Sequence, residues 1–168
     1  SPSNQYNNGY KTPFATVMTC GTGDFDNGNS QSEAFVKLGT VNNPEGAVAA
    51  VGLATTGTHT AYNNIVDMGI YDGIFSKKLW YAGAAEANGD LSILSTYPSN
   101  PSGATEAFIA WSNLIGDPAL HLWTGIPVNF AVDHVDIISL GSTTTDIIVY
   151  NEYGNEVEGA RVTLLMGD

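Results

Sequence analysis

The single cysteine of the chain, Cys20, is its best candidate for covalent chemistry. It follows the β-prone run 14–19 and precedes a glycine-rich loop, 21–29. In open α/β sheets, sites form at the carboxyl ends of the strands. A thiolate nucleophile needs access, a neighbouring base or cation, and backbone N–H groups that hold an oxyanion. This position fits a nucleophile, and on position alone a buried structural thiol fits equally well.

A base for this thiol is not evident among the three histidines, His59, His121 and His134. A papain-type peptidase places its cysteine at a helix start, and a caspase-type peptidase places its histidine some tens of residues upstream. Only 19 residues precede Cys20, and none of them is histidine. We expect His59 in a loop or pocket wall near the same sheet edge, His121 in a packing role and His134 at the surface.

The loop after Cys20 also carries oxygen ligands of the kind that calcium prefers, Asp24, Asp26 and Asn29. Their spacing does not fit an EF-hand, and a solvated loop is the favoured interpretation. Calcium bound by these three residues is the alternative, and no cofactor is required. The sequence contains no P-loop and no dinucleotide fingerprint.

Composition excludes several classes of protein. Lys plus Arg number 5 and Asp plus Glu 17, which gives a formal net charge of −12 and disfavours nucleic-acid binding. One cysteine excludes a disulfide framework and a cysteine-based metal cluster. No apolar run reaches the roughly 20 residues of a membrane span. The first residues lack methionine and the features of a signal peptide, so we expect a chain that was processed, cut or only partly recorded. The composition suits an exported protein.

Local patterns predict an α/β arrangement over residues 1–125. Ser30 and Glu33 form a capping-box pair before an apolar run, which predicts a helix ending at Gly39. The run 46–54 is small and apolar on both faces, as in a central parallel strand, and a polar loop, 55–60, follows. The other expected elements are a buried strand at 14–19, a helix at 62–80 weakened by glycines and Asp67, a helix at 82–96 interrupted at 88–90, and a helix at 105–115 stopped by 116–118.

The pattern changes to alternating, β-branched residues after a boundary near 125–127. We expect three strands, at 128–140, 144–150 and 159–165, with a turn at 151–155. Three strands with open edges do not make a stable sandwich on their own. Residues 126–168 therefore read as the first strands of a truncated immunoglobulin-like β-sandwich.

Four segments together resemble the gingipain-like cysteine peptidases, peptidase family C25. The run 14–25, FATVMTCGTGDF, resembles the nucleophile strand and loop, and 32–35 resembles the helix that follows. Residues 46–52 with 58–60 resemble the next strand and its loop. The run 113–120, NLIGDPAL, resembles the segment near the end of the peptidase domain.

The resemblance implies a caspase-like (gingipain-type) α/β/α half-domain at 1–125, followed by the partial immunoglobulin-like sandwich, in a secreted or cell-surface bacterial protein. It implies that Cys20 is the nucleophile and that its backbone N–H belongs to the oxyanion hole. It implies that the loop from Thr55 to Thr60 forms one wall of the substrate cleft, with Gly21, Thr58, His59 and Thr60 as the substrate-binding residues. The family's catalytic histidine, on an earlier strand, and the acidic residue that sets basic P1 preference have no counterpart in this sequence.

The expected function is a segment of a secreted cysteine endopeptidase, with a protein or peptide as substrate and the upstream half of the same domain as partner. Without its histidine, the chain alone is not expected to turn over substrate. The alternative is a non-catalytic cell-surface or filament-forming module that reuses the scaffold and associates through open β-edges. A third hypothesis is a calcium-stabilised adhesion module that uses the acidic loop.

Overall fold

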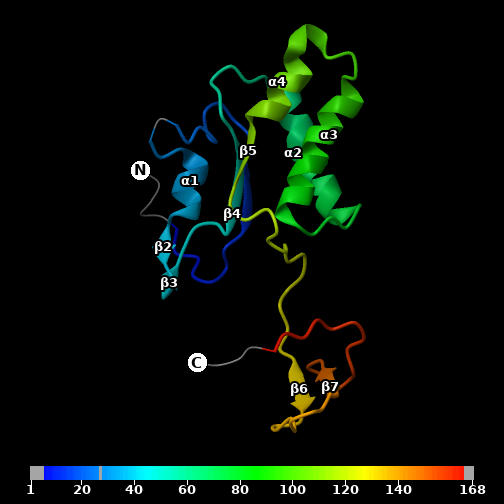
Figure 1. The fold of residues 1–168 in the computed structure, drawn as a ribbon. Helices are drawn as coiled ribbons and strands as arrows, with labels where there is room; N and C mark the ends of the chain where they lie inside the picture. The colour runs from blue at the N-terminus through cyan, green and yellow to red at the C-terminus, as the bar shows by residue number, and fades with distance from the viewer. Residues whose placement is uncertain (1–5, 27, 165–168) are drawn as a thin grey trace. The chain divides into compact units, whose positions relative to one another are not determined.

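A three-stranded sheet organises the first of the two units into which the chain divides, Ser1–Thr124 and Gly125–Asp168. The computed structural model describes residues 6–26 and 28–164 (Figure 1). In this sheet β4 (Ala49–Leu53) lies between β1 (Phe14–Val17), which is parallel to it, and an antiparallel strand, β5 (Ser112–Ile115). Every residue of β4 is buried, which confirms the predicted central strand. The prediction of a buried strand before Cys20 is corrected, because β1 is a half-buried edge strand.

The predicted helix at 105–115 is wrong in its second half. The helix α4 (Ala104–Trp111) is shorter, and residues 112–115 form β5 instead. The switch occurs where Ala54 N–H donates to the Trp111 carbonyl at 2.8 Å and Leu53 comes into register with Ser112. Hydrogen bonding along the open edge of β4 therefore outweighs the helical pattern of this segment.

Helices cover both faces of the sheet (Figure 1). The helix α1 (Gln31–Val36) lies on one face, and α2 (Thr60–Phe75), α3 (Ala82–Thr96) and α4 lie on the other. The capping box predicted for α1 is present, with the Ser30 side chain accepting from the Glu33 N–H. The helix ends before Gly39, which instead begins a short hairpin, β2 (Gly39–Thr40) and β3 (Asn43–Pro44). A short 3-10 turn, η2 (Pro101–Gly103), precedes α4.

The helix pair α2–α3 packs through the small residues that weakened its prediction. The helix α3 runs without interruption through residues 88–90. A Cβ placed on Gly89 would lie 2.8 Å from the Val66 carbonyl, and one placed on Gly69 would lie 2.4 Å from the Ser92 hydroxyl. The amide of Asn88 donates to the Gly69 carbonyl at 2.6 Å. The two backbones can therefore approach closely.

The core of this unit lies between the sheet and the three helices α2, α3 and α4. Its buried members are mostly aliphatic: Val51, Val66, Ile70, Ile74, Ala82, Ala85, Ile93, Phe108 and Leu122. None of the helices in residues 6–26 and 28–164 is long and apolar enough to cross a lipid bilayer.

The second unit contains one two-stranded antiparallel sheet within its described residues, 125–164. It pairs β6 (Ala131–His134) with β7 (Ile147–Tyr150), so both strands are shorter than predicted. The predicted turn at 151–155 is present, since the Asn151 carboxamide accepts from the N–H groups of Tyr153 and Asn155. No strand forms at 159–164, and Leu165, the last residue of the predicted third strand, lies outside the described residues.

Candidate active site

Cys20 lies just beyond the carboxyl end of β1, and its side chain is exposed. The chain turns immediately afterwards, because Gly21 adopts a φ of +69° and its N–H donates to the Thr55 carbonyl at 2.7 Å. The exposed position removes the interpretation of Cys20 as a buried structural thiol. The thiol instead has the access that a nucleophile requires.

The loop that carries Cys20 is tied to the central strand through two glycines. The N–H of Gly23 donates to the Leu53 carbonyl at 3.0 Å. A Cβ on Gly23 would lie 2.4 Å from the carbonyl carbon of Gly52, so the two backbones touch. The buried Thr22 hydroxyl donates to the carbonyls of Val17 and Thr19. The position of the thiol is therefore set by the core of the unit.

The segment 58–60 places Thr58 against the thiol and gives His59 another role. Thr58 Oγ1 lies 3.0 Å from Cys20 Sγ. The ring Nδ1 of His59 caps α2 by accepting from the Ala61 N–H at 3.2 Å. Thr60 is the exposed first residue of that helix. The structure thus gathers Cys20, Gly21 and Thr58 at one sheet edge, with His59 and Thr60 next in the chain.

Hydrogen bonding lowers the pKa of the Cys20 thiol below its ordinary value. The largest cause is the side-chain hydrogen bond to Thr58, followed by a backbone hydrogen bond from Thr58. Desolvation opposes them, and a backbone hydrogen bond of Cys20 itself contributes in the same direction as Thr58. A thiol with a lowered pKa carries more of the reactive thiolate at neutral pH.

Sequence reasoning missed one residue behind this site, Asn63. Its amide nitrogen donates to the Met18 carbonyl at 3.1 Å and to Thr58 Oγ1 at 3.3 Å, and the side chain is buried. A signal was present in the sequence. Asn63 shares the buried face of α2 with Val66 and Ile70, and a polar residue on an apolar helix face needs a hydrogen-bond partner.

The remaining histidines lie in other surroundings. His121 pairs with Tyr81 in an isolated β-bridge, with 5.4 Å between their ring centroids, and lies 6.0 Å from the Trp80 ring. His134 belongs to β6 in the second unit, where its Nδ1 lies 3.0 Å from the Val135 carbonyl oxygen. The described residues show no hydrogen bond between either ring and Cys20.

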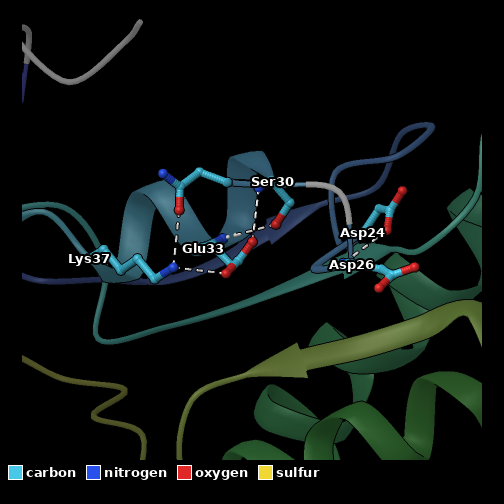
Figure 2. Close-up of polar contacts among 6 residues, drawn as sticks. Asp24, Asp26, Ser30, Glu33 and Lys37 are labelled. Atoms are coloured by element: carbon cyan, nitrogen blue, oxygen red, sulfur yellow. Dashed lines mark hydrogen bonds and ion pairs between the residues drawn. The ribbon is translucent and has the colours of Figure 1, made fainter.

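The acidic loop divides between two local networks (Figure 2). Asp24 Oδ1 accepts from the Asp26 N–H at 3.2 Å. Asn29 Oδ1 instead accepts from Lys37 Nζ at 3.0 Å, and Lys37 also pairs with Glu33 at 2.9 Å. The bond to Lys37 is the largest cause that lowers the pKa of Glu33.

Calcium binding by Asp24, Asp26 and Asn29 stays a prediction. Within residues 6–26 and 28–164, no group of three or more His, Cys, Asp or Glu side chains is arranged to hold a metal ion. The ammonium group of Lys37 on the amide oxygen of Asn29 competes with a cation there. Unfolding followed in calcium and in a chelator tests the prediction, because only a bound ion separates the two midpoints.

A second group of titratable residues lies on α3, at the other edge of the sheet. Burial raises the pKa of Glu86 and, helped by the charge of Glu86, raises that of Asp90 to about 7. The nearby Ser112 hydroxyl partly offsets the rise of both pKa values. Within the described part of the chain, neither this buried hydroxyl nor Asp90 Oδ1 makes a hydrogen bond of normal geometry.

Asp90 should make the chain less stable as the pH rises. Its folded-state pKa lies above its ordinary value of 3.8, so its contribution is complete below that value and is lost as the pH rises through about 7. The free energy of unfolding of the wild type should therefore fall between about pH 5 and pH 8. Allowing for the partial exposure of Asp90, we expect this fall to be about 1–2 kcal/mol smaller in Asp90→Asn. Urea unfolding at both pH values measures it. The exposed Glu106→Gln is the control, and equal pH dependence in wild type and Asp90→Asn would contradict the assignment.

Comparison with known proteins adds a family and a fold to this geometry. The model of "Peptidase family C25" matches residues 1–123. Two solved structures align at 20% identity: the Arg-specific cysteine proteinase gingipain R, with a TM-score of 0.71, and a complex of Porphyromonas gingivalis RgpB pro- and mature domains, with a TM-score of 0.72. They cover 84% and 88% of this chain, which spans 33% and 35% of theirs. No curated protein matches. The described first unit therefore has the fold of the corresponding part of a gingipain.

Proposed function

Because the chain belongs to peptidase family C25, we propose that it is a segment of a secreted bacterial cysteine endopeptidase whose nucleophile is Cys20. The observation that carries the proposal is the exposed thiol at a strand end, 3.0 Å from the hydroxyl of Thr58. The thiol follows the strand β1 and precedes the glycine-rich loop, and this position supports the proposed role.

The proposed reaction is acyl transfer. The Cys20 thiolate attacks the carbonyl carbon of the scissile peptide bond, and the C–N bond breaks as a histidine gives its proton to the leaving amine. Water then attacks the thioester, loses a proton to the same histidine and releases the acid and the thiolate. We assign this histidine to a segment upstream of Ser1, since no hydrogen bond joins a histidine ring to the thiol among the described residues.

The loop geometry supports a proposal for the oxyanion donor and for the cleft wall. The N–H of Gly21 is already bonded to the Thr55 carbonyl, so the proposal gives the oxyanion to the N–H of Cys20. Gly21 then supplies the turn. Thr58, His59 and Thr60 are proposed to face the substrate, because they follow the same sheet edge.

The proposed partner in this reaction is the upstream half of the same domain. β1 is an edge strand of the sheet that the described residues form, and its Thr16 hydroxyl lies 3.3 Å from that of Tyr71 on α2. The neighbouring face of α2 exposes an apolar stripe, with 72% of Met68 and 64% of Phe75 accessible. A further strand and the residues that follow it would pair with β1 and cover this stripe.

A thiol-directed peptide inhibitor on the intact parent protein tests the proposal. We expect covalent labelling of Cys20 in the native protein, located by peptide mapping, because the thiolate is accessible and a histidine stands beside it. The free 168-residue chain, which lacks that histidine, should turn over no peptide substrate. Labelling that occurs only after the parent is denatured would count against a catalytic cysteine.

A non-catalytic surface or filament-forming module is the second candidate, and the second unit favours it. Its two strands leave large apolar side chains accessible, among them Ile137 and Leu140. We propose that this unit supplies the first strands of an immunoglobulin-like sandwich, whose later strands would cover these exposed residues. An intact mass of the native protein separates the two candidates. A mature species equal to this chain, associating through its β-edges, favours the module, and a longer or monomeric species favours the peptidase.

A further inference from the structure

Thr58 and Asn63 form a hydrogen-bonded relay that ends at the Cys20 sulfur. The Asn63 amide nitrogen lies 3.3 Å from Thr58 Oγ1, which lies 3.0 Å from Cys20 Sγ. The same nitrogen lies 3.1 Å from the carbonyl oxygen of Met18. The relay thus spans the strand end, the loop before α2 and the first turn of that helix.

The direction of each hydrogen bond follows from chemistry. A backbone carbonyl only accepts, so the amide group facing Met18 must be the nitrogen of Asn63. That nitrogen only donates, so the Thr58 oxygen accepts from it and keeps its own proton for another partner. Among the described residues, the acceptor that lies within reach of that proton is Cys20 Sγ. A thiolate has no proton to give, so this arrangement suits the charged form of the cysteine.

Burial holds the relay in place. Only 7% of Asn63 is exposed, and its backbone N–H donates to the His59 carbonyl at 3.0 Å in the first turn of α2. Its carboxamide oxygen is also buried, without a hydrogen-bond partner among the described residues. Leaving a buried oxygen unpaired costs free energy. The Asn63 side chain keeps this orientation because its amide nitrogen bonds to both the Met18 carbonyl and Thr58 Oγ1.

We propose that Thr58 is a positioning residue that orients and stabilises the Cys20 thiolate, and that Asn63 fixes the direction of the Thr58 hydroxyl. The catalytic meaning of this relay rests on the proposed function, but its effect on the thiol does not. The lowered pKa of Cys20 agrees, because Thr58 supplies its two largest causes. No charged side chain is among those causes, and the nearby His59 uses its Nδ1 to cap α2.

The rate of alkylation of the 168-residue chain by iodoacetamide, measured across pH, tests the relay. Thr58→Val keeps the shape of the side chain and removes the hydroxyl. Loss of this exposed hydroxyl donor should reduce the thiolate fraction at neutral pH about 3- to 10-fold and shift the rate profile to higher pH. Thr58→Ser restores the hydroxyl and should restore the profile. Thr56→Val, an exposed threonine of the same loop, is the matched control.

Each outcome separates the relay from the proposed function. A folded Thr58→Val chain, checked by circular dichroism, whose profile coincides with that of the wild type would overturn the relay. Asn63→Leu is a second test variant. It removes the amide donor to Thr58 and should also shift the alkylation-rate profile to higher pH. If the profile shifts but the intact parent is not labelled by the peptide inhibitor, the relay stands and the peptidase proposal fails. If the parent is labelled and the profile does not shift, only the relay fails.

Discussion

Replacement of Cys20 by alanine should reduce kcat/KM for peptide hydrolysis by the intact parent about 10⁴-fold or more. The thiol would supply the electrons that form the thioester, and no other side chain described at this sheet edge can replace it. Folding should change little, because Cys20 is exposed and its side chain bonds to Thr58 alone among the described residues. Steady-state kinetics with a peptide substrate and urea unfolding of the same variant measure the two effects.

Two companion variants sharpen this experiment. Cys20→Ser keeps a hydroxyl in the same place but, with the far higher pKa of an alcohol, should also lose most of the activity. Thr143→Val should leave kcat/KM unchanged, because its side chain is exposed in the second unit and has no part in the proposed reaction. Activity of the alanine variant within tenfold of the wild type would show that another group is the nucleophile.

Gly23→Ala should destabilise the first unit by about 3 kcal/mol or more. The added Cβ would lie 2.4 Å from both the carbonyl carbon and the oxygen of Gly52, and these are backbone atoms of the buried strand β4. A side chain could rotate away from such a contact, but a central strand cannot. The loop that carries Cys20 would have to leave the sheet, and the Gly23–Leu53 hydrogen bond would be lost.

Denaturant unfolding of the 168-residue chain measures this effect. Gly57→Ala is the matched control in a neighbouring loop, because its Cβ would meet only the Thr55 hydroxyl, at 3.8 Å. We expect the control to change stability by less than about 1 kcal/mol. A Gly23→Ala chain as stable as the control would mean that the loop does not rest on β4 in solution.

Features that depend on neighbours in sequence were predicted well. The capping box of α1 needs only Ser30 and Glu33, and both hydrogen bonds are present. The strand β4 was predicted from an apolar run that is buried on both faces. Its neighbour β5 was missed, because Ser112–Ile115 has no strand pattern of its own and becomes a strand by pairing with β4. Likewise, the glycines of α2 and α3 weaken a helix taken singly and favour a closely packed pair.

In the candidate site, too, the features of single residues could be predicted and the contacts between residues distant in sequence could not. Cys20 was chosen as the candidate nucleophile from its type and its place after a strand, and its predicted accessibility is confirmed. Its contact with Thr58 joins residues 38 positions apart, and the Asn63–Met18 bond joins residues 45 apart, so neither could be derived from local pattern. Asn29 was assigned to the acidic loop by its type, whereas Lys37 on the following helix binds its amide oxygen.

The close α2–α3 pair bears on the order in which the chain folds. Its partners are near neighbours in sequence, so the entropy lost in bringing them together is small, whereas β1 must find β4 across a longer loop. We expect the helical hairpin to form before the sheet, and the Cys20–Thr58 contact to form with or after the sheet. Brief pulses of a thiol reagent during refolding should then detect the change in Cys20 reactivity as a late event.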